Sequence, residues 1–504
     1  MKLHKTFLAS LALVLGWSGT AFAQNEVDAL RYSRYGVSGS ARIQGIGGAQ
    51  TALGADISTM SVNPAGLGMF RRSEFGISPG LQFNNTQTSI NGFNSTQDRN
   101  TLSIPQAGLV LSNHKSDEED SDWRGASLGI SLTRLNNFNQ QLNYSNTTGE
   151  TTPTIVEYFA DQANANGRTL AELNSEFNNG FTSLEGLAFG TYLIDVQTDD
   201  NGQEFVTPLT RIGSMNQAEQ IKRSGSQNQF DIGVGTSYRD KLYLGASLGI
   251  ITTNFTQESI YTEAENSAET AFTGLELRDQ FTTQGAGVNL RVGAIFRPID
   301  AVRIGASVQT PTAYTLNDQY QRSLYASYDD GPTESASEIP GEFTYQLTTP
   351  FRANGGVAVF LNKYGFITAD VEYVDYGSTR FHEQQDEYGN AGNYFTDVNN
   401  TIASTYKSAI NYKIGAEGRY EVFRFRAGYG VSGDPYRNAS FDGKVNSYSL
   451  GAGVRLQKYY LDAAFVSSKG NTRYSPYVFS NGGEPVVDID QKQNTLLFTL
   501  GYNF

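Results

Sequence analysis

The chain ends in Leu496-Leu497-Phe498-Thr499-Leu500-Gly501-Tyr502-Asn503-Phe504, and this stretch decides the fold. Side chains of a β-strand point alternately to its two faces. One face therefore carries Leu496, Phe498, Leu500, Tyr502 and Phe504, and the other carries Leu497, Thr499, Gly501 and Asn503. The pattern predicts an amphipathic strand that reaches the last residue. Soluble sandwiches and membrane-spanning barrels both contain such strands, so the rest of the chain must decide between them.

A hydrophobic strand that ends in Phe504, with Tyr502 two positions earlier, resembles the C-terminal signal of outer-membrane β-barrels. The N-terminus is typical of an exported protein. Basic residues precede an apolar core from Phe7 to Trp17, and Ala21-Phe22-Ala23 has the form of a cleavage site. We expect a signal peptide over residues 1–23, cleavage after Ala23, and a mature protein in the bacterial outer membrane.

Composition restricts the possible functions. The 504 residues include 53 Gly, 29 Tyr and 30 Phe but no Cys, which excludes disulfides, thiolate metal sites and a Cys nucleophile. A net charge of −14 argues against nucleic acid as a partner. No long apolar stretch follows the signal peptide, so any membrane-spanning part must be a closed barrel.

From about residue 73 onward the chain reads as amphipathic strands joined alternately by tight turns and long polar loops. Short periplasmic turns and long extracellular loops are typical of outer-membrane barrels. The fold class predicted is all-β, a 14-stranded antiparallel transmembrane β-barrel over residues 73–504. The strands are expected at 74–90, 101–112, 123–145, 224–238, 241–258, 281–297, 301–320, 341–361, 366–382, 404–420, 423–432, 445–456, 459–468 and 491–504. Pro350 is expected to kink the eighth strand.

The longest connection, residues 146–223, differs from the other loops. Ile155, Val156, Phe159, Ala160 and Ala163, followed by Leu170, Leu173 and Phe177, recur at helical spacing. We expect two short amphipathic helices in a long extracellular loop. They could form a lid or landing surface for a ligand, or be ordinary solvated surface helices.

Residues 24–72 do not read as strands. A run of small residues over 41–60 contains Asp56 and Ser58, and Asn63-Pro64-Ala65-Gly66-Leu67 follows it. Small side chains permit close backbone packing in a confined lumen. Pro64 lacks an amide donor and restricts the backbone of Asn63 to extended geometry.

These features resemble the FadL/TodX family of outer-membrane transporters for hydrophobic compounds. The specific likeness covers residues 41–70. It implies that residues 24–72 form a small N-terminal hatch inside the lumen of a 14-stranded barrel, with Asn63, Pro64, Ala65 and Gly66 as its motif. The count of fourteen strands above was made from the alternation of short and long loops, so it agrees independently with the strand number that the resemblance implies.

The resemblance implies passive uptake of a hydrophobic or lipid-like molecule, for example a long-chain fatty acid. Hatch movement would release it sideways through the barrel wall, near a kink in the third strand. Asn136-Asn137 interrupts the alternation of that strand and is the candidate kink and lateral opening.

Several lumenal charges are expected to pair across the barrel and to support the hatch, because an unpaired buried charge is costly. They are Arg291, Arg303, Asp370, Glu372, Lys413, Glu417, Arg419, Arg424, Arg426 and Arg455. The expected partners of the protein are the hydrophobic ligand and outer-membrane lipids, and the protein is expected to be a monomer without cofactor or metal.

Other functions remain open at this point. A haem-related uptake receptor would need ligands, but the two mature His residues, His114 and His382, should lie at opposite ends of the barrel. A hydrolase is disfavoured, because no G-x-S-x-G sequence stands at a strand-to-helix turn, where the nucleophile elbow of a hydrolase lies. A FadL-like scaffold of a secretion or surface-attachment complex would be marked by a stable partner. An open porin would be marked by a large steady conductance.

Overall fold

The computed structural model describes residues 26–116, 119, 121–149, 152–209, 214–265, 271–329, 331–384, 392–438 and 441–504. The predicted signal peptide and its cleavage site lie outside them. None of the helices among the described residues has the length and apolar character to cross a membrane.

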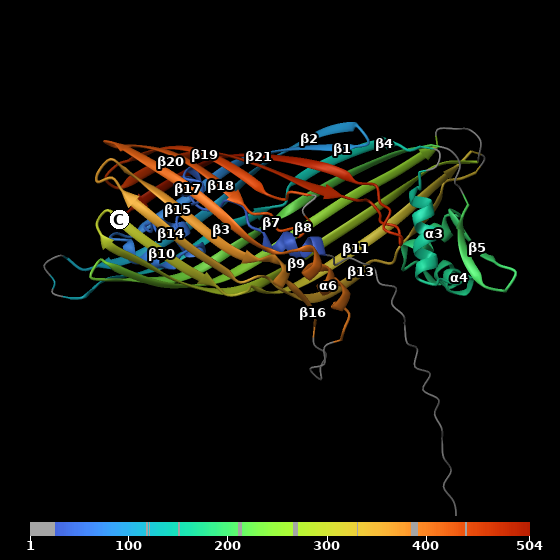
Figure 1. The fold of residues 1–504 in the computed structure, drawn as a ribbon, viewed down its shortest axis with the longest axis horizontal. Helices are drawn as coiled ribbons and strands as arrows, with labels where there is room; N and C mark the ends of the chain where they lie inside the picture. The colour runs from blue at the N-terminus through green and yellow to red at the C-terminus, as the bar shows by residue number, and fades with distance from the viewer. Residues whose placement is uncertain are drawn as a thin grey trace, which may run out of the picture.

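The wall of the molecule is a closed antiparallel barrel of fourteen strands, as the sequence predicts (Figure 1). Some wall strands are interrupted and carry two or three labels. In chain order they are β1 (Glu74–Ile90), β2 (Phe93–His114), β3 (Trp123–Asn137) with β4 (Gln140–Thr147), β7 (Met215–Tyr238), β8 (Leu242–Glu265), β9 (Phe272–Ile299), β10 (Val302–Gln309) with β11 (Ala313–Tyr328), β12 (Glu334–Ser337) with β13 (Gly341–Thr348) and β14 (Arg352–Phe360), β15 (Gly365–Asp375) with β16 (Arg380–Glu383), β17 (Ser408–Tyr420), β18 (Phe423–Ser432), β19 (Val445–Arg455), β20 (Tyr459–Tyr474) and β21 (Val487–Asn503).

The last strand closes the barrel against the first. β21 pairs with β1 from Asn503 opposite Glu74 to Asp488 opposite Ser89. The amide of Phe504 donates to the carbonyl oxygen of Ser73 at 3.0 Å. The terminal strand of the sequence is therefore the fourteenth strand of the barrel.

The two ends of the barrel differ in their connections (Figure 1). At the turn end, the connections from β7 to β8, β9 to β10 and β17 to β18 leave two or three residues between strands. At the loop end, the chain leaves the wall for longer excursions. The hairpin of β1 and β2 is an exception, because it turns at Asn91-Gly92 with both residues at positive φ. The second strand thus begins at Phe93, where we had predicted residue 101.

The outer surface is apolar and the inner surface is small or polar. On β8, Leu244 and Leu248 are exposed, whereas Tyr243 and Ser247 are buried inside. Two bands of exposed aromatic residues flank the apolar zone. Tyr412 and Tyr420 mark them on β17. Tyr420 lies eight residues after Tyr412. At a rise of ~3.4 Å per residue and a strand tilt of ~40°, the two bands are about 20 Å apart along the barrel axis, a spacing that fits the apolar layer of a membrane.

Several strands break where the sequence reading had them continuous. Pro350 separates β13 from β14, as expected, but the break between β10 and β11 at Pro311 was not foreseen. A 3-10 turn, η3 (Tyr376–Ser378), divides β15 from β16. The predicted strand over 404–420 was too long, because helix α6 (Thr396–Thr405) occupies its beginning.

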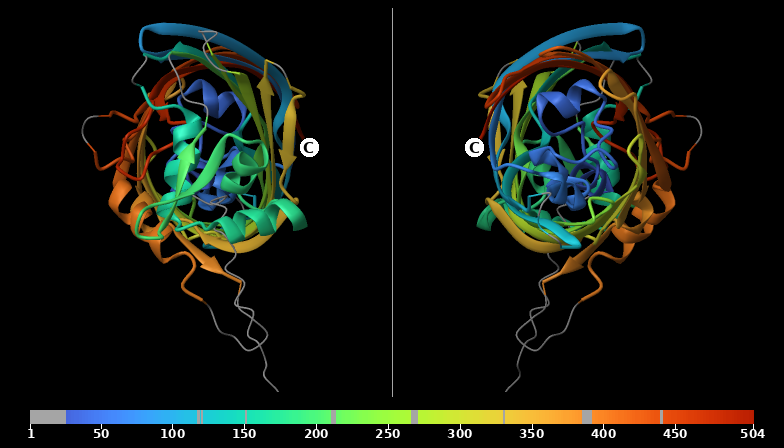
Figure 2. Two further views of the ribbon diagram at one scale, coloured as in Figure 1. Left: turned by 90° about the vertical axis from the view of Figure 1, so that its right-hand side faces the viewer. Right: turned by 90° about the vertical axis from the view of Figure 1, so that its left-hand side faces the viewer.

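The long loop covers the loop end of the barrel (Figure 2, left). It runs over residues 148–214, shorter than predicted, because β4 and β7 extend further. It contains α3 (Ile155–Ala165) and α4 (Leu170–Asn179), where two helices were expected, and also α5 (Leu184–Gly190) and a hairpin of β5 (Ile194–Thr198) and β6 (Glu204–Pro208). α3 and α5 pack with the ends of β8, β9 and β11 and with Tyr477 in one apolar cluster.

The N-terminal segment, residues 26–72, lies in the lumen (Figure 2, right). It comprises α1 (Glu26–Ser33), α2 (Ala41–Gly45) and two 3-10 helices, η1 (Ile57–Ser61) and η2 (Pro64–Met69). α1 lies in an aromatic cluster with Tyr314, Tyr345 and Phe395 from the loop half of the barrel. α2, η1 and η2 contact the wall nearer the turn end.

Candidate functional site

Asn63 fixes the end of the N-terminal segment. Its side-chain oxygen accepts from the amide of Ala65 at 3.2 Å, and Pro64 supplies the first residue of η2. An Asn cap followed by Pro begins a helical turn with few unpaired amides. The side-chain amide of Asn63 also donates to the carbonyl oxygens of Thr51, at 2.7 Å, and Ala294, at 3.2 Å, so it ties the segment to β9.

Glycines of the wall allow this part of the segment to approach the strands closely. A Cβ at Gly245 would lie 2.3 Å from the carbonyl carbon of Pro64, and one at Gly293 would lie 2.0 Å from the Asn63 side-chain oxygen. Within the segment, a Cβ at Gly66 would lie 2.9 Å from the Cα of Gly54. The motif residues Asn63, Pro64, Ala65 and Gly66 therefore act in packing and capping.

Asp56 and Ser58 hold the start of η1. The Asp56 carboxylate accepts from the Ser58 amide at 3.1 Å and from the Ser58 hydroxyl at 2.7 Å. Ser40, the cap of α2, donates to the other oxygen at 2.8 Å. One buried carboxylate thus joins the two short helices.

Charged side chains of the wall hold the segment by its backbone. Arg291 donates to the carbonyl oxygen of Met60 at 2.7 Å, and Arg303 donates to that of Leu53 at 2.6 Å. Asp370 accepts from the amides of Gln50 and Thr51 at 2.7 and 2.8 Å. These three residues support the segment as the sequence led us to expect.

Other lumenal charges pair with each other. Glu372 lies 2.8 Å from Arg352 and 3.9 Å from Lys413. Glu417 lies 2.8 Å from both Arg419 and Arg426. Arg352 was missing from the predicted set, because Pro350 obscured the register of its strand.

The third wall strand is interrupted immediately after the candidate kink. β3 ends at Asn137 and β4 begins at Gln140, with a register shift against β7 between Arg134 and Asn136. The side-chain amide of Asn136 donates to the carbonyl oxygen of Arg34 at 2.8 Å and to Gln227 at 3.0 Å. The amide of Gly36 donates to the carbonyl oxygen of Leu135 at 3.2 Å. The kink therefore contacts the N-terminal segment directly.

Backbone pairing in the wall is incomplete beside this kink. β2 pairs with β3 only from Gln106 to His114. Among the described residues, 93–105 of β2 pair with β1 alone, and β4 pairs with β7 alone. Neither face of β2 is buried over 93–105. We call this unpaired stretch between β2 and β3–β4 the wall gap.

Polar side chains bridge the wall gap in place of a backbone ladder. Asn137 donates to the hydroxyl of Thr101 on β2 at 3.0 Å and to the side-chain oxygen of Gln82. Beside the gap, Thr88 on β1, the neighbour of β2, donates to the carbonyl oxygen of Asn143 on β4 at 2.5 Å. Arg99 on β2 reaches across to the carbonyl oxygen of Arg223 at 2.8 Å. Side-chain bridges can part without breaking a strand ladder.

Sequence reasoning identified Asn136-Asn137 but not the wall gap. Two prolines in the sequence could have indicated the wall gap. Pro105 directly precedes the first β2 residue that pairs with β3, and Pro79 lies at the register shift between β1 and β2. Because proline lacks an amide donor, it is found at bulges and at the ends of ladders.

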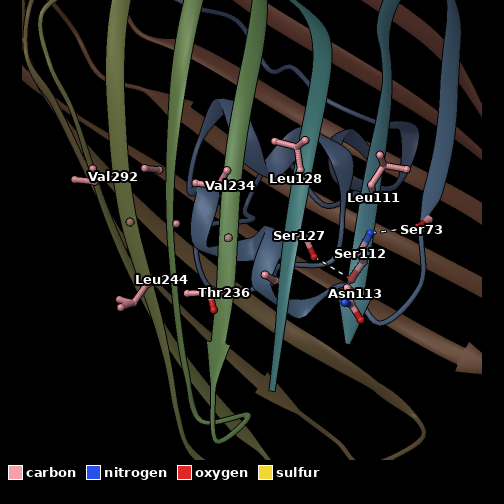
Figure 3. A pocket seen from close by; sticks show the side chains of 15 residues that line it. Ser73, Leu111, Ser112, Asn113, Ser127, Leu128, Val234, Thr236, Leu244 and Val292 are labelled. Atoms are coloured by element: carbon pink, nitrogen blue, oxygen red, sulfur yellow. Dashed lines mark hydrogen bonds between the residues drawn. The ribbon is translucent and has the colours of Figure 1, made fainter. Parts of the chain in front are cut away.

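The outer surface near the turn end carries an apolar groove of about 830 Å³ (Figure 3). It crosses β2, β3, β7, β8 and β9, and its lining includes Leu111, Leu128, Val234 and Val292. The groove backs onto the N-terminal segment, because Gly235 and Gly245 on the same strands contact that segment. It was not predicted.

The two histidines lie far from each other. His114 ends β2 at the turn end, where Nε2 is 3.3 Å from an oxygen of Asp240. His382 is on β16 at the loop end. Among the described residues, no group of three or more His, Cys, Asp or Glu could hold a metal ion. Neither histidine supports a bis-His haem site within one chain.

Of the comparisons with known proteins, the one with solved structures identifies the fold. No family model and no curated protein matches the sequence. The structure is similar to a Pseudomonas aeruginosa FadL homologue, with 12% identity, coverage of 94% of this chain and 100% of that chain, and a TM-score of 0.56. It is also similar to the P. putida toluene transporter TodX, with 14% identity, coverage of 92% and 98%, and a TM-score of 0.51. The expected fold is thus confirmed: this chain has the same barrel fold as these two structures.

Proposed function

We propose that the protein is an outer-membrane channel for passive uptake of hydrophobic compounds such as long-chain fatty acids. The N-terminal segment acts as a hatch, and the ligand leaves sideways through the wall gap. The observation that carries the proposal is the place of the gap: the wall lacks a backbone ladder beside the kink that contacts the segment. The similarity to structures described as a FadL homologue and a toluene transporter supports the ligand class.

Two aromatic clusters, one at the loop end and one at the kink, support this route. Aromatic residues gather at the loop end, where Tyr158, Tyr477 and Phe479 pack together. Below them, Phe138 at the kink packs edge-to-face on Phe255 and Tyr32. Lateral exit from this level keeps the ligand out of water and avoids a hydration penalty of ~0.8 kcal/mol per CH₂.

A disulfide across the wall gap tests the proposal. The chain has no cysteine, so T101C/N137C introduces a single pair where the side chains already touch. In cells whose own transporter is deleted, we expect the oxidised variant to take up radiolabelled palmitate or toluene no faster than cells without the protein. A reductant should restore uptake, because the lock prevents β2 and β3 from parting.

The matched control is Q106C/T133C, which joins the same two strands where they are already paired. Oxidation there should leave uptake unchanged. Unchanged uptake in the locked T101C/N137C variant would overturn the lateral route. Wild-type uptake at the background rate would overturn transport itself and favour the scaffold alternative.

A further inference from the structure

A second, polar cavity lies in the lumen at the turn end. It has a volume of about 260 Å³ and is lined by Arg42, Glu417, Arg419, Arg424 and Arg455. Arg42 belongs to α2 of the N-terminal segment, and the other four belong to β17, β18 and β19. Four guanidinium groups thus face one carboxylate. We call this set the arginine pocket.

The carboxylates of this region are already engaged. The two oxygens of Glu417 accept from Arg419 and Arg426, each at 2.8 Å. The two oxygens of Asp462 accept from Arg426 at 2.7 Å and from Arg455 at 2.9 Å. Arg42 lies 3.8 Å from Glu417 and 3.9 Å from Asp56, so it shares carboxylates that already accept other hydrogen bonds.

Arg424 carries the surplus positive charge. Its Nη1 donates to the carbonyl oxygens of Glu421 and Phe423, both at 2.8 Å. Within the described parts of the chain, no carboxylate forms an ion pair with it. It also lies directly opposite Arg419 in the pairing of β17 with β18. Like charges opposite each other destabilise a sheet, so this arrangement calls for an anion.

Arg426 stands behind the pocket and does not line it. It is 4% exposed, and its Nη2 has no hydrogen-bond partner among the described residues. A buried guanidinium donor without a partner is costly. The cavity is open to solvent at three of its arginines: the exposed fraction of the side chain is 15% for Arg42 and 28% for Arg419 and Arg455. An ion that enters the cavity can therefore contact them.

We propose that the arginine pocket binds an oxyanion, a carboxylate or phosphate group. Planar guanidinium groups bind such groups through paired hydrogen bonds. Because Arg42 is on the N-terminal segment and its partners are on the wall, the bound anion contacts both. Transport does not require this site, and the site does not require transport, so the inference stands apart from the proposed function.

Equilibrium dialysis of the full-length protein in detergent, with radiolabelled inorganic phosphate at constant ionic strength, tests the pocket. Wild-type protein should show saturable binding of one phosphate per chain. R424Q should weaken it about tenfold or more, because a charge-assisted contact is lost. R473Q is the matched control: Arg473 pairs with Asp488 on exposed strands at the loop end, and binding should not change.

R455Q serves as a second variant should R424Q fail to fold, as judged by heat-dependent migration on SDS gels. Competition with decanoate, and with the uncharged decanol of the same chain length, distinguishes an amphipathic carboxylate from a free inorganic ion. Displacement of phosphate by decanoate but not decanol identifies the carboxylate of an amphipathic molecule, whereas displacement by neither identifies the free ion. Non-saturable binding to wild type, or equal binding by R424Q and wild type, would overturn the proposal.

Discussion

Single residues with small or polar side chains determine how the N-terminal segment meets the wall. Asn63 caps η2 and hydrogen-bonds β9 through one carboxamide. Gly245 lets the backbone of Pro64 lie against β8. Neither residue adds an apolar side chain to the core, so each acts by allowing or fixing the close approach of the two backbones. A larger side chain at Gly245 therefore tests this role more directly than a smaller side chain at another position.

Gly245→Val should displace the N-terminal segment, because its Cβ would overlap the backbone of Pro64. We expect a steady conductance in planar bilayers that the wild-type protein lacks. Gly355→Val is the control: Gly355 has open space where a Cβ would stand. Equal conductance in the two variants would contradict the close-packing argument.

Among the elements, the helices of the long loop are held by their caps. In α4, the Thr169 side chain accepts from the Glu172 amide at 3.3 Å, and Glu172 accepts from the Thr169 amide at 3.0 Å. This capping box satisfies amides that the first turn leaves unpaired. Leu173 is the buried residue of α4, so the cap matters more here than in a well-buried helix.

Thr169→Ala should destabilise α4 by about 1 kcal/mol, the usual cost of losing such a cap. Hydrogen exchange of the 170–179 peptide should therefore speed up severalfold, while exchange in α3 stays the same. Asn174→Ala, on the exposed face of the same helix, should leave exchange unchanged or slower. Faster exchange in both variants would mean that the cap is not the cause.

The same cap predicts a pH dependence. The hydrogen bond from the Thr169 amide lowers the pKa of Glu172 below 4.5. A lowered pKa stabilises the folded helix at higher pH, and that stability is lost as the pH falls through the folded value. Exchange of α4, corrected for its intrinsic rate, should rise on acidification in the wild type but not in Glu172→Gln. A parallel rise in both would contradict this assignment.

The elements also show how far sequence can lead. Period-2 alternation placed β1 at its observed bounds, and apolar residues at helical spacing located α3 and α4, because local patterns encode local structure. Asn91-Gly92 is also a local hairpin signal, and it was overlooked. The wall gap and the arginine pocket could not be read this way. Both depend on which residues of distant strands stand opposite each other, as Arg419 and Arg424 do.

At the scale of the whole molecule, side chains of the wall hold the N-terminal segment by hydrogen bonds to its backbone. Arg291, Arg303 and Asp370 point from the wall to the segment backbone. The wall has its own continuous ladder apart from the gap. The barrel should therefore persist without the segment, with a lumen that admits water and ions.

Deletion of residues 26–62 tests that independence. We expect the shortened protein to keep heat-dependent migration on SDS gels and to raise bilayer conductance on the order of tenfold or more, as for a barrel with a water-filled lumen. A small non-electrolyte should pass at a similar rate, which separates an open lumen from a leak of ions alone. Loss of heat-dependent migration would show that the wall needs the segment to fold.

The hydrogen bond between Phe504 and Ser73 has a consequence for the order of assembly. Ser73 directly follows the N-terminal segment, and Phe504 directly follows β21. The final seam joins positions more than four hundred residues apart, so it forms late. Until then the sheet is an open, curved surface, and the segment can lie on its concave side. If the seam closes last, the cylinder is completed around a segment that is already in place.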